Sequence, residues 1–593
     1  MRKPVKQVNP ALEGEIESLR YWQLLAIILL LSGFLLPRKT LAQTEPLVSL
    51  TAQTGLDGYC KINHWFPVRV TMENNGADLE GWVEVTPVDT SIDKWRYTQA
   101  VSLPGVSRKE VTVFVYPKRN ISKVAISFST GDGIISKIVM PVTCVPPGDS
   151  IYGVWAAIPS VFNPLTALAP PGGRASLAQL ELADFPNHSQ GFDMLDILVI
   201  SGVDTGPLTN VQRQAIANWV SNGGRLVIAG GPSWQKTAAG LDEFLPLHPN
   251  DSVTLASLSS LETFSRAAES LDGNTVVAVG DLEEAAIVIA SQDEIPLIIR
   301  SQTGFGEVYY FAPDLAIAPL RSWLGIEDLY GSLFGPPLDV PAWAGGFTTW
   351  RDTADALANV PGLGLPSVFL ICGFLGLYVL ALGPLNYLIL YRIKRRELAW
   401  ITIPVLVLLF SGVAFIVGIA IRGNRPVINE LAIVEIWPEN EQARVHGLIG
   451  VFSPRRKTYR LEVSGNFLAH PIPSGQFTGD EDWRFEQTKD GIAIPKMRID
   501  VGGIEAVAIV GEVPAPAFSQ DLSLRFTNGA ALVEGSIQNS SQVTLRDAIV
   551  LGPGQAIKIG SFSPGERKEI QLTISATTAN PNGNPLINAP HSF

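Results

Sequence analysis

Cysteine and histidine are scarce in this sequence, and their scarcity removes several classes of site. Of the 593 residues, three are cysteine and six are histidine. No Cys-x-x-Cys pair occurs, and no group of these residues has the spacing of a zinc site. Residues 150–345 contain no cysteine, which excludes a cysteine nucleophile there. We therefore predict no metal ion and no cofactor.

Ionisable residues are missing from two long apolar runs. No charged residue lies between Asp355 and Arg392, and residues 398–421 form a second uncharged run. About 20 mainly apolar residues are enough to cross a bilayer as a helix, whereas core helices of soluble proteins are shorter and keep a polar face. The pattern predicts a transmembrane helical hairpin over residues 366–421. A transporter role is disfavoured, because neither span offers an ionisable group.

The connection between the two runs carries a cluster of positive charge. It reads YRIKRRE, and its basic residues are Arg392, Lys394, Arg395 and Arg396. Short loops rich in lysine and arginine mark the cytoplasmic side of a membrane. We therefore predict a protein of the cytoplasmic membrane with a cytoplasmic turn, and with residues 43–365 and 423–593 outside the cytoplasm.

A third uncharged run, residues 21–37, follows four basic residues near the N-terminus. It is just long enough to span, and Thr40-Leu41-Ala42 after it resembles a signal-peptidase site. Residues 1–42 fit a signal peptide and a retained anchor equally well. In both cases the chain after Ala42 is translocated, which agrees with the hairpin topology.

Two of the three cysteines, Cys60 and Cys144, fall in the first external segment. An extracytoplasmic compartment permits a disulfide between them. Two free, buried thiols are the alternative, and the sequence does not decide between these states.

Alternating apolar and polar residues predict β-structure in three external segments. Residues 46–146 have short strands and turn signals typical of an immunoglobulin-like β-sandwich. The same plan recurs over residues 516–577, since ALVEGSIQNSSQVTLRDAIV parallels FPVRVTMENNGADLEGWVEV and GSFSPGERKEIQLTI parallels VSLPGVSRKEVTVFV. Residues 428–513 are predicted to be β-rich. Residues 578–593 are polar and rich in proline and asparagine, which is typical of a disordered tail.

Residues 150–345 have a different pattern, with apolar strands separated by an amphipathic helix. Residues 194–201 and 225–231 read as buried strands, and residues 209–222 between them read as a helix that Gly223 and Gly224 end. Thr209 and Gln212 have capping-box spacing. A strand, a helix and a strand joined by short loops predict a parallel βαβ unit in a doubly wound α/β domain.

The stretch DMLDILVISGVDTGPLTNVQRQAIANWVSNGGRLVIAGG resembles the class I glutamine amidotransferase-like fold in a non-catalytic form. With the β-sandwich before it and the hairpin after it, the chain resembles uncharacterised bacterial membrane proteins of that domain order. The resemblance implies a multidomain membrane protein, with α/β and all-β parts, and no catalytic residues.

Four residues at the ends of the predicted strands are candidate ligand-binding residues. Ligands of open α/β sheets sit outside the carboxyl ends of the strands, where Gly202, Asp204, Gly231 and Ser233 are expected. Most of these residues are ordinary turn formers, and turn formation is the favoured explanation. A hydrolase would need Ser233 with His248 as base, or an acidic pair from Asp314 and residues 479–483.

The sequence therefore favours a non-enzymatic, membrane-anchored protein of the bacterial cell envelope. We expect its extracytoplasmic domains to bind a partner protein or an envelope polymer. The alternatives are an extracytoplasmic hydrolase with a non-cysteine site, and a small-molecule or glycan receptor. The net charge of −12 argues against a nucleic-acid partner. The oligomeric state stays open.

Overall fold

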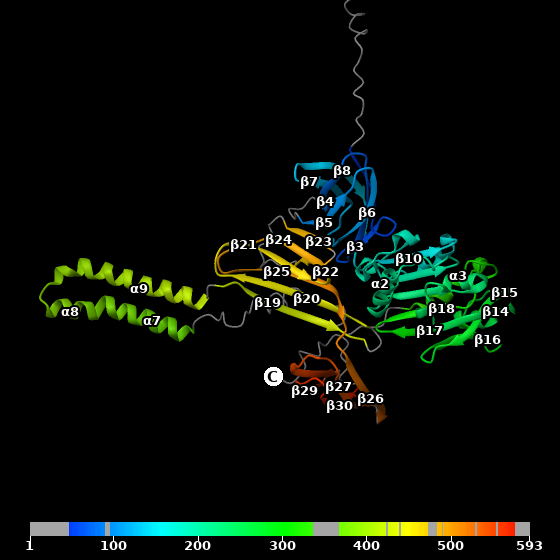
Figure 1. The fold of residues 1–593 in the computed structure, drawn as a ribbon. Helices are drawn as coiled ribbons and strands as arrows, with labels where there is room; N and C mark the ends of the chain where they lie inside the picture. Colours follow the sequence, from blue (N-terminus) through cyan, green and yellow to red (C-terminus); the bar gives the residue numbers. More distant parts are fainter. Residues whose placement is uncertain are drawn as a thin grey trace, which may run out of the picture. The chain divides into compact units, whose positions relative to one another are not determined.

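The computed structural model describes residues 47–88, 95–335, 367–422, 425–437, 441–472, 483–488, 490–527, 530–552 and 555–575 (Figure 1). The predictions for residues 1–42 and 578–593 lie outside these ranges. Strands predominate in the described chain, which confirms the prediction of several β-sheet regions. Everything described below belongs to one compact unit, residues 48–593.

The first β region consists of two sheets with buried valine-rich faces. One is the antiparallel sheet β1 (Val48–Thr54), β3 (Phe66–Asn74) and β6 (Ser107–Val115). Val68, Val70 and Met72 alternate along β3 and are fully buried, as a strand with one core face requires. The other sheet begins with β5 (Arg96–Leu103), β4 (Leu79–Val88), β7 (Lys123–Thr130) and β8 (Gly133–Pro141). A short parallel pair, β2 (Tyr59–Lys61) and β9 (Thr143–Val145), lies beside them.

This second sheet does not end within the first β region. It continues through β23 (Arg484–Thr488), β24 (Gly491–Ile499) and β21 (Lys457–Ser464), giving seven strands in the order β21-β24-β23-β5-β4-β7-β8 (Figure 1). The sequence pattern treats residues 46–146 and 428–513 as separate domains. The structure joins them, since β23 pairs in parallel with β5.

Buried side chains reinforce the junction between β23 and the first β region. The rings of Tyr97 and Phe485 stack with centroids 5.4 Å apart, and both residues are fully buried. The Gln487 amide donates to the Phe114 carbonyl oxygen at 2.7 Å and accepts from the Phe114 N–H at 3.0 Å. Apolar burial and satisfied polar groups therefore act together at this junction.

The remaining strands after the hairpin form three further sheets. The largest is antiparallel and consists of β19 (Val427–Glu435), β20 (Gln442–Ser453), β25 (Gly503–Pro514) and β22 (Asn466–Pro471). The last β region contains the sheet β26 (Phe518–Thr527), β27 (Ala530–Asn539) and β30 (Arg567–Ser575). Beside it lies the pair β28 (Leu545–Gly552) and β29 (Gln555–Phe562).

The internal repeat read from the sequence has a structural counterpart. The sheet β26-β27-β30 has the antiparallel arrangement of β1-β3-β6. Asn74 ends β3 and Asn539 ends β27, and both side chains are buried. The Asn74 amide donates to the Leu103 carbonyl at 3.3 Å, and the Asn539 amide donates to the Phe562 carbonyl at 3.0 Å. An equivalent buried asparagine therefore makes the same kind of backbone hydrogen bond in both copies.

Residues 150–333 form a mixed sheet with helices in its connections. The strand order is β11-β10-β12-β13-β18-β17-β16. Five strands are parallel: β10 (Ser150–Ala156), β11 (Ala175–Gln179), β12 (Ile197–Ser201), β13 (Arg225–Ala229) and β18 (Gly306–Phe311). The strands β17 (Ile295–Thr303) and β16 (Ile287–Gln292) extend the sheet antiparallel. A separate ribbon contains β14 (Leu247–Ser257) and β15 (Asp272–Leu282).

The helix α2 (Asn210–Ser221) connects β12 to β13, as the βαβ pattern predicts. Thr209 and Gln212 form the predicted capping box. Ala215, Trp219 and Val220 of α2 are buried, whereas Val211 is 56% exposed. The other helices of the region are α3 (Trp234–Ala238), α4 (Ser259–Ser265) and α5 (Ile326–Leu333).

Short 3-10 turns complete the connections. They are η1 (Pro159–Leu168), η2 (Leu182–Asp184), η3 (Ser189–Phe192), η4 (Gly231–Ser233), η5 (Asp242–Phe244), η6 (Leu320–Ser322) and, before α9, η8 (Arg396–Leu398).

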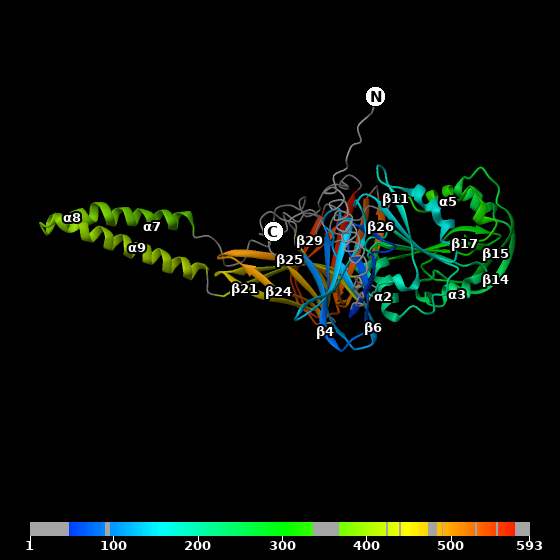
Figure 2. The same cartoon turned by 90° about the horizontal axis from the view of Figure 1, so that it is seen from above.

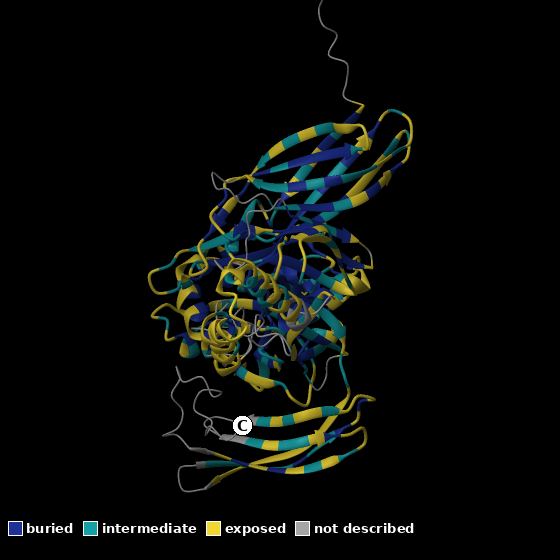
Figure 3. Cartoon of the chain, turned by 90° about the vertical axis from the view of Figure 1, so that its left-hand side faces the viewer, coloured by how far each residue is buried: buried dark blue, intermediate teal, exposed yellow. Residues whose placement is uncertain are grey.

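The predicted hairpin consists of two helical arms. The first contains α7 (Val368–Leu380), a π-helical turn, η7 (Ala381–Leu385), around Pro384, and α8 (Asn386–Arg392), and the second is α9 (Ala399–Arg422) (Figure 2). The stretches Val368–Arg392 and Arg396–Gly418 have mean hydropathies of 2.3 and 2.5. Most of their large apolar side chains are exposed, as the helices at the front of Figure 3 show. The described part of the chain therefore has two helices long and apolar enough to cross a membrane.

We predict that Asn74→Ala will destabilise the first β region by roughly 1–3 kcal/mol, because the Leu103 and Pro104 carbonyls and the Gly76 N–H lose their partner. The matched control is Asn75→Ala, since Asn75 is exposed next to it. Urea unfolding of the two variants measures the difference. An equal loss in both would contradict the role given to Asn74.

Candidate functional site

The predicted ligand-binding glycines lie at the carboxyl ends of two neighbouring parallel strands. Gly202 follows β12 with φ +66°, and Gly231 lies just after β13 with φ +67°. Asp314 packs against this point, and a Cβ built on Gly231 would lie 2.4 Å from the Asp314 Cβ. The Asp314 carboxylate accepts hydrogen bonds from the Ser201 hydroxyl at 3.2 Å and the Ala316 N–H at 2.8 Å. Gly231 therefore has a packing role that only glycine can fill.

The other two candidates have local partners. The Asp204 carboxylate accepts from the Gly206 N–H at 3.0 Å, which is a turn contact. Ser233 belongs to η4, and its carbonyl accepts from the Thr237 hydroxyl. Ligand binding by Gly202, Asp204, Gly231 and Ser233 stays a prediction.

His248, the base of the hydrolase alternative, lies beside two acidic side chains. The His248 imidazole lies 3.2 Å from an Asp242 oxygen and 3.8 Å from a Glu283 oxygen. Asp314 is buried, and burial raises the pKa of its carboxyl group. The other half of the acidic pair, residues 479–482, lies outside the described part of the chain.

The two cysteines of the first β region face each other across the β2–β9 pair. Cys60 and Cys144 are register partners with Cα atoms 4.4 Å apart, and the structure joins them in a disulfide. Both are buried, whereas Cys372 is a free, exposed residue on α7.

The basic residues of the predicted cytoplasmic turn lie where α8 gives way to α9. Arg392 ends α8, Lys394 has φ +59°, and Arg395 and Arg396 lead into η8. The Arg396 guanidinium lies 4.9 Å from the Tyr391 ring centroid, a cation–π contact at the turn.

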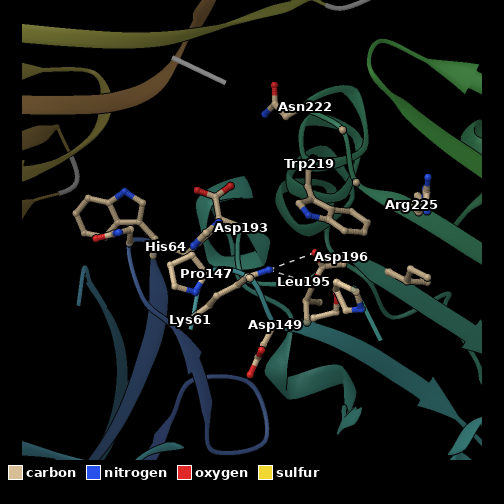
Figure 4. A pocket seen from close by; sticks show the side chains of 18 of the residues that line it. Lys61, His64, Pro147, Asp149, Asp193, Leu195, Asp196, Trp219, Asn222 and Arg225 are labelled. Carbon is tan, nitrogen blue, oxygen red and sulfur yellow. Dashed lines mark hydrogen bonds and ion pairs between the residues drawn. The ribbon is translucent and has the colours of Figure 1, made fainter. Parts of the chain in front are cut away.

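A cavity of about 850 Å³ lies at the amino ends of the parallel strands (Figure 4). The predicted site lies at the carboxyl ends of the same strands. Ser150, Ile197 and Arg225, which line it, are the first residues of β10, β12 and β13. The first β region contributes Lys61 and His64, and the sheet after the hairpin contributes residues of β20, β22 and β25. Three parts of the chain thus meet at this cavity.

One charged pair at the cavity joins the first β region to the α/β region. The Lys61 Nζ lies 3.2 Å from both carboxylate oxygens of Asp196. The Asp196 carboxylate also accepts from the Ile151 N–H at 2.9 Å. The Lys61 side chain is only 7% exposed, so the pair is partly withdrawn from water and its partners depend on each other.

A second charged pair joins the α/β region to the sheet after the hairpin. Arg444 of β20 lies 3.6 Å from the Asp193 carboxylate, beyond hydrogen-bond distance. Burial raises the pKa of Asp193 to about 6, with Arg444 opposing the shift and Glu512 adding to it. Burial also raises the pKa of Glu512, which accepts a hydrogen bond from the Ser189 hydroxyl.

Aromatic and imidazole rings form another part of the cavity wall. The Tyr116 and His470 rings stack with centroids 3.9 Å apart, and Trp65 meets His470 edge-on at 5.9 Å. Burial lowers the pKa of His470 and of His446 to about 3, so both imidazoles are neutral at physiological pH. Nε2 of His446 and Nε of Arg444 are buried without a hydrogen-bond partner in the described chain.

The chemistry available at this cavity is hydrogen bonding, charge pairing and aromatic contact. Among the described residues, no group of three or more histidine, cysteine, aspartate or glutamate side chains could hold a metal ion. The sequence reasoning missed this site, because Lys61, Asp193 and Arg444 are far apart in the chain and each resembles an ordinary surface residue. The only local hint is a lysine inside the apolar stretch YCKINHWF.

Comparisons with protein families give matches over the first and the last β regions. Two family models match, each described as a domain of unknown function: DUF8726 over residues 47–141 and DUF8725 over residues 519–591. They overlap the two copies of the internal repeat, and neither covers half of the chain. No curated protein matches the chain.

Several solved structures share limited similarity with the chain. A cytoplasmic protein of Salmonella typhimurium is 16% identical, with 36% of this chain and 94% of that chain covered, at a TM-score of 0.24. A CARDB domain of Pyrococcus furiosus is also 16% identical, with 17% and 90% covered, at 0.14. An exo-chitosanase of Amycolatopsis orientalis is 9% identical, with 90% and 77% covered, at 0.17. These TM-scores are too low to support an argument about function.

We predict that Asp193→Asn will change the pH dependence of stability. The folded chain raises the pKa of Asp193 from 3.8 to about 6, so folding favours the protonated carboxyl. This contribution is fully present below the unfolded pKa and is lost as the pH rises through 6. Between pH 4 and 7 the wild type should lose roughly 2–3 kcal/mol that the variant keeps.

Urea unfolding of both proteins at intervals from pH 4 to 8 measures this difference. Contributions from groups that do not interact with Asp193 are common to both proteins and cancel, whereas Glu512, which is coupled to Asp193, belongs to the measured difference. Parallel stability curves would show that the fold does not perturb Asp193.

Proposed function

We propose that the protein is a non-enzymatic, membrane-anchored component of the bacterial cell envelope. Its extracytoplasmic domains would bind a partner protein or an envelope polymer. The observation that carries the proposal is the pairing of β23 with β5, because these strands come from opposite sides of the hairpin in the sequence.

Strand pairing across the hairpin supports a two-span topology. Strands of one sheet must lie in the same compartment, so the chain must return to the side it left between Leu103 and Arg484. Two membrane crossings satisfy this condition, and a single crossing does not. The two apolar helices supply two crossings.

Charge and redox chemistry indicate which side the sheets occupy. The turn between the helices carries Arg392, Lys394, Arg395 and Arg396, and such loops favour the cytoplasm. The Cys60–Cys144 disulfide fits an oxidising compartment outside the cytoplasm. Both features support residues 43–365 and 423–593 as extracytoplasmic and the turn as cytoplasmic.

We further propose finer assignments for the external regions. The parallel order β11-β10-β12-β13-β18 agrees with a doubly wound domain, which supports a non-catalytic amidotransferase-like origin for residues 150–345. The two modules that share the buried asparagine are proposed to be immunoglobulin-like sandwiches.

A receptor for a small molecule or glycan is the second candidate. The cavity at the amino ends of β10, β12 and β13 favours it. The two functions are compatible, since a ligand at the meeting point of three chain regions could accompany partner binding. A hydrolase is less favoured, because among the described residues the His248 ring contacts Asp242 and Glu283 and makes no hydrogen bond to Ser233.

The topology predicts opposite labelling of two introduced cysteines. In a Cys372→Ala background, Val106→Cys lies in an exposed turn and Lys394→Cys lies in the basic turn. A membrane-impermeant maleimide should label position 106 in right-side-out vesicles and position 394 only in inverted vesicles. The reverse pattern would contradict the proposed placement.

Partner binding is tested by cross-linking in native membranes, followed by capture of the tagged full chain and mass spectrometry. We expect one or a few envelope proteins, or one envelope polymer, to be enriched over an untagged control. If a folded preparation reproducibly enriches nothing, the scaffold proposal is wrong.

A further inference from the structure

The cavity at the amino ends of the parallel strands has a balanced set of charges. Its lining includes three cationic side chains (Lys61, Arg225 and Arg444) and three carboxylates (Asp149, Asp193 and Asp196). Buried His446 and His470 add no charge at physiological pH. A strongly anionic or cationic ligand therefore finds no net complement there, whereas a neutral polar ligand does.

Donors and acceptors in the cavity lie close to one another. The Asp193 carboxylate meets Arg444 at 3.6 Å, which leaves its oxygens free to accept shorter hydrogen bonds. Asp196 is 38% exposed beside Lys61, and the amide of Asn222 offers both a donor and an acceptor. In Figure 4, Asp193, Trp219 and Asn222 surround the cavity above the Lys61–Asp196 pair.

A hydroxyl group matches this arrangement better than other neutral groups. It donates one hydrogen bond and accepts others, so neighbouring hydroxyls can bridge a carboxylate and a guanidinium at once. Aromatic side chains, among them Trp219 and Tyr116, provide apolar surface for the C–H faces between such hydroxyls. The volume of about 850 Å³ is within the range of small-molecule sites.

We infer that this cavity binds a neutral saccharide of a few sugar units, with hydroxyls held between Asp193 and Arg444. The ligand touches the first β region, the α/β region and the sheet after the hairpin, and so stabilises their association. The inference specifies the receptor function proposed as second candidate, and it requires neither the membrane topology nor a protein partner.

A peptide fits the site less well. Extended peptides bind by adding to the open edge of a sheet, where a row of N–H and carbonyl groups is free. The cavity instead meets β10, β12 and β13 at their ends, and β10, β12 and β13 each have paired neighbours on both sides. The backbone groups that recognise a strand are therefore already used.

The test uses the full chain in lipid nanodiscs, because detergents with sugar headgroups would compete. Tryptophan fluorescence is titrated with maltotetraose, cellotetraose and tetra-N-acetylchitotetraose, and with tetra-alanine and inorganic phosphate as comparison ligands. At least one tetrasaccharide should bind, and Asp193→Ala should weaken its binding about tenfold or more, as the loss of a charge-assisted hydrogen bond implies. Asp132→Ala, in the exposed turn between β7 and β8, is the matched control and should bind as the wild type does.

If Asp193→Ala does not fold, Asn222→Ala replaces it with a weakened binding expected in the same direction. The inference is overturned if no tetrasaccharide binds, or if only tetra-alanine or phosphate binds. It is equally overturned if saccharide binding is the same in the cavity variant and in Asp132→Ala. Failure of partner capture leaves these outcomes unchanged, so the two proposals fail separately.

Discussion

The parallel pairing of β23 with β5 is the constraint on which the arrangement of the other sheets depends. Four residue pairs carry it, from Arg484 with Arg96 to Gln487 with Gln99. Buried Tyr97 and Phe485 exclude water from the junction, and the Gln487 amide satisfies both backbone groups of Phe114. Because β5 precedes the hairpin and β23 follows it, the pairing requires both ends of the hairpin to lie on the same side of a membrane that it crosses. It also brings β20, β22 and β25 to the amino ends of the α/β strands.

The cavity follows from this meeting of three regions. Two ion pairs and one hydrogen bond connect the three regions. The ion pairs are Lys61 with Asp196 and Arg444 with Asp193, and the hydrogen bond runs from the Ser189 hydroxyl to Glu512. Buried ion pairs add little net stability, yet losing one partner leaves a costly unpaired charge. These contacts therefore specify which surfaces meet more than they increase stability. The buried, unpartnered Nε atom of Arg444 and Nε2 atom of His446 show that the junction is not fully satisfied by protein groups.

Local patterns in the sequence were sufficient for the parts of the fold that local physics determines. Uncharged runs gave the two hairpin helices, the Thr209–Gln212 spacing gave the start of α2, and the repeat gave modules with Asn74 and Asn539 in equivalent places. The β5–β23 pairing could not be read in this way, because Tyr97 and Phe485 are both ordinary strand residues with no local sign of their partner. The general rule for ligand sites in α/β sheets pointed to Gly231, which follows β13. Asp314 occupies the space next to Gly231. The cavity lies at the other edge, and its charged residues come from segments on both sides of the hairpin.

The most direct test of this account is a disulfide between the two halves of the shared sheet. Arg96→Cys and Arg484→Cys occupy paired positions of β5 and β23, and a protease site is inserted at the basic turn in a Cys372→Ala background. After cleavage, the account predicts that the N- and C-terminal fragments stay joined on a non-reducing gel. The control pair, Arg96→Cys with exposed Arg525→Cys of β26, should separate. Separation of the Arg96–Arg484 pair to the same extent would contradict the joint fold of the segments before and after the hairpin.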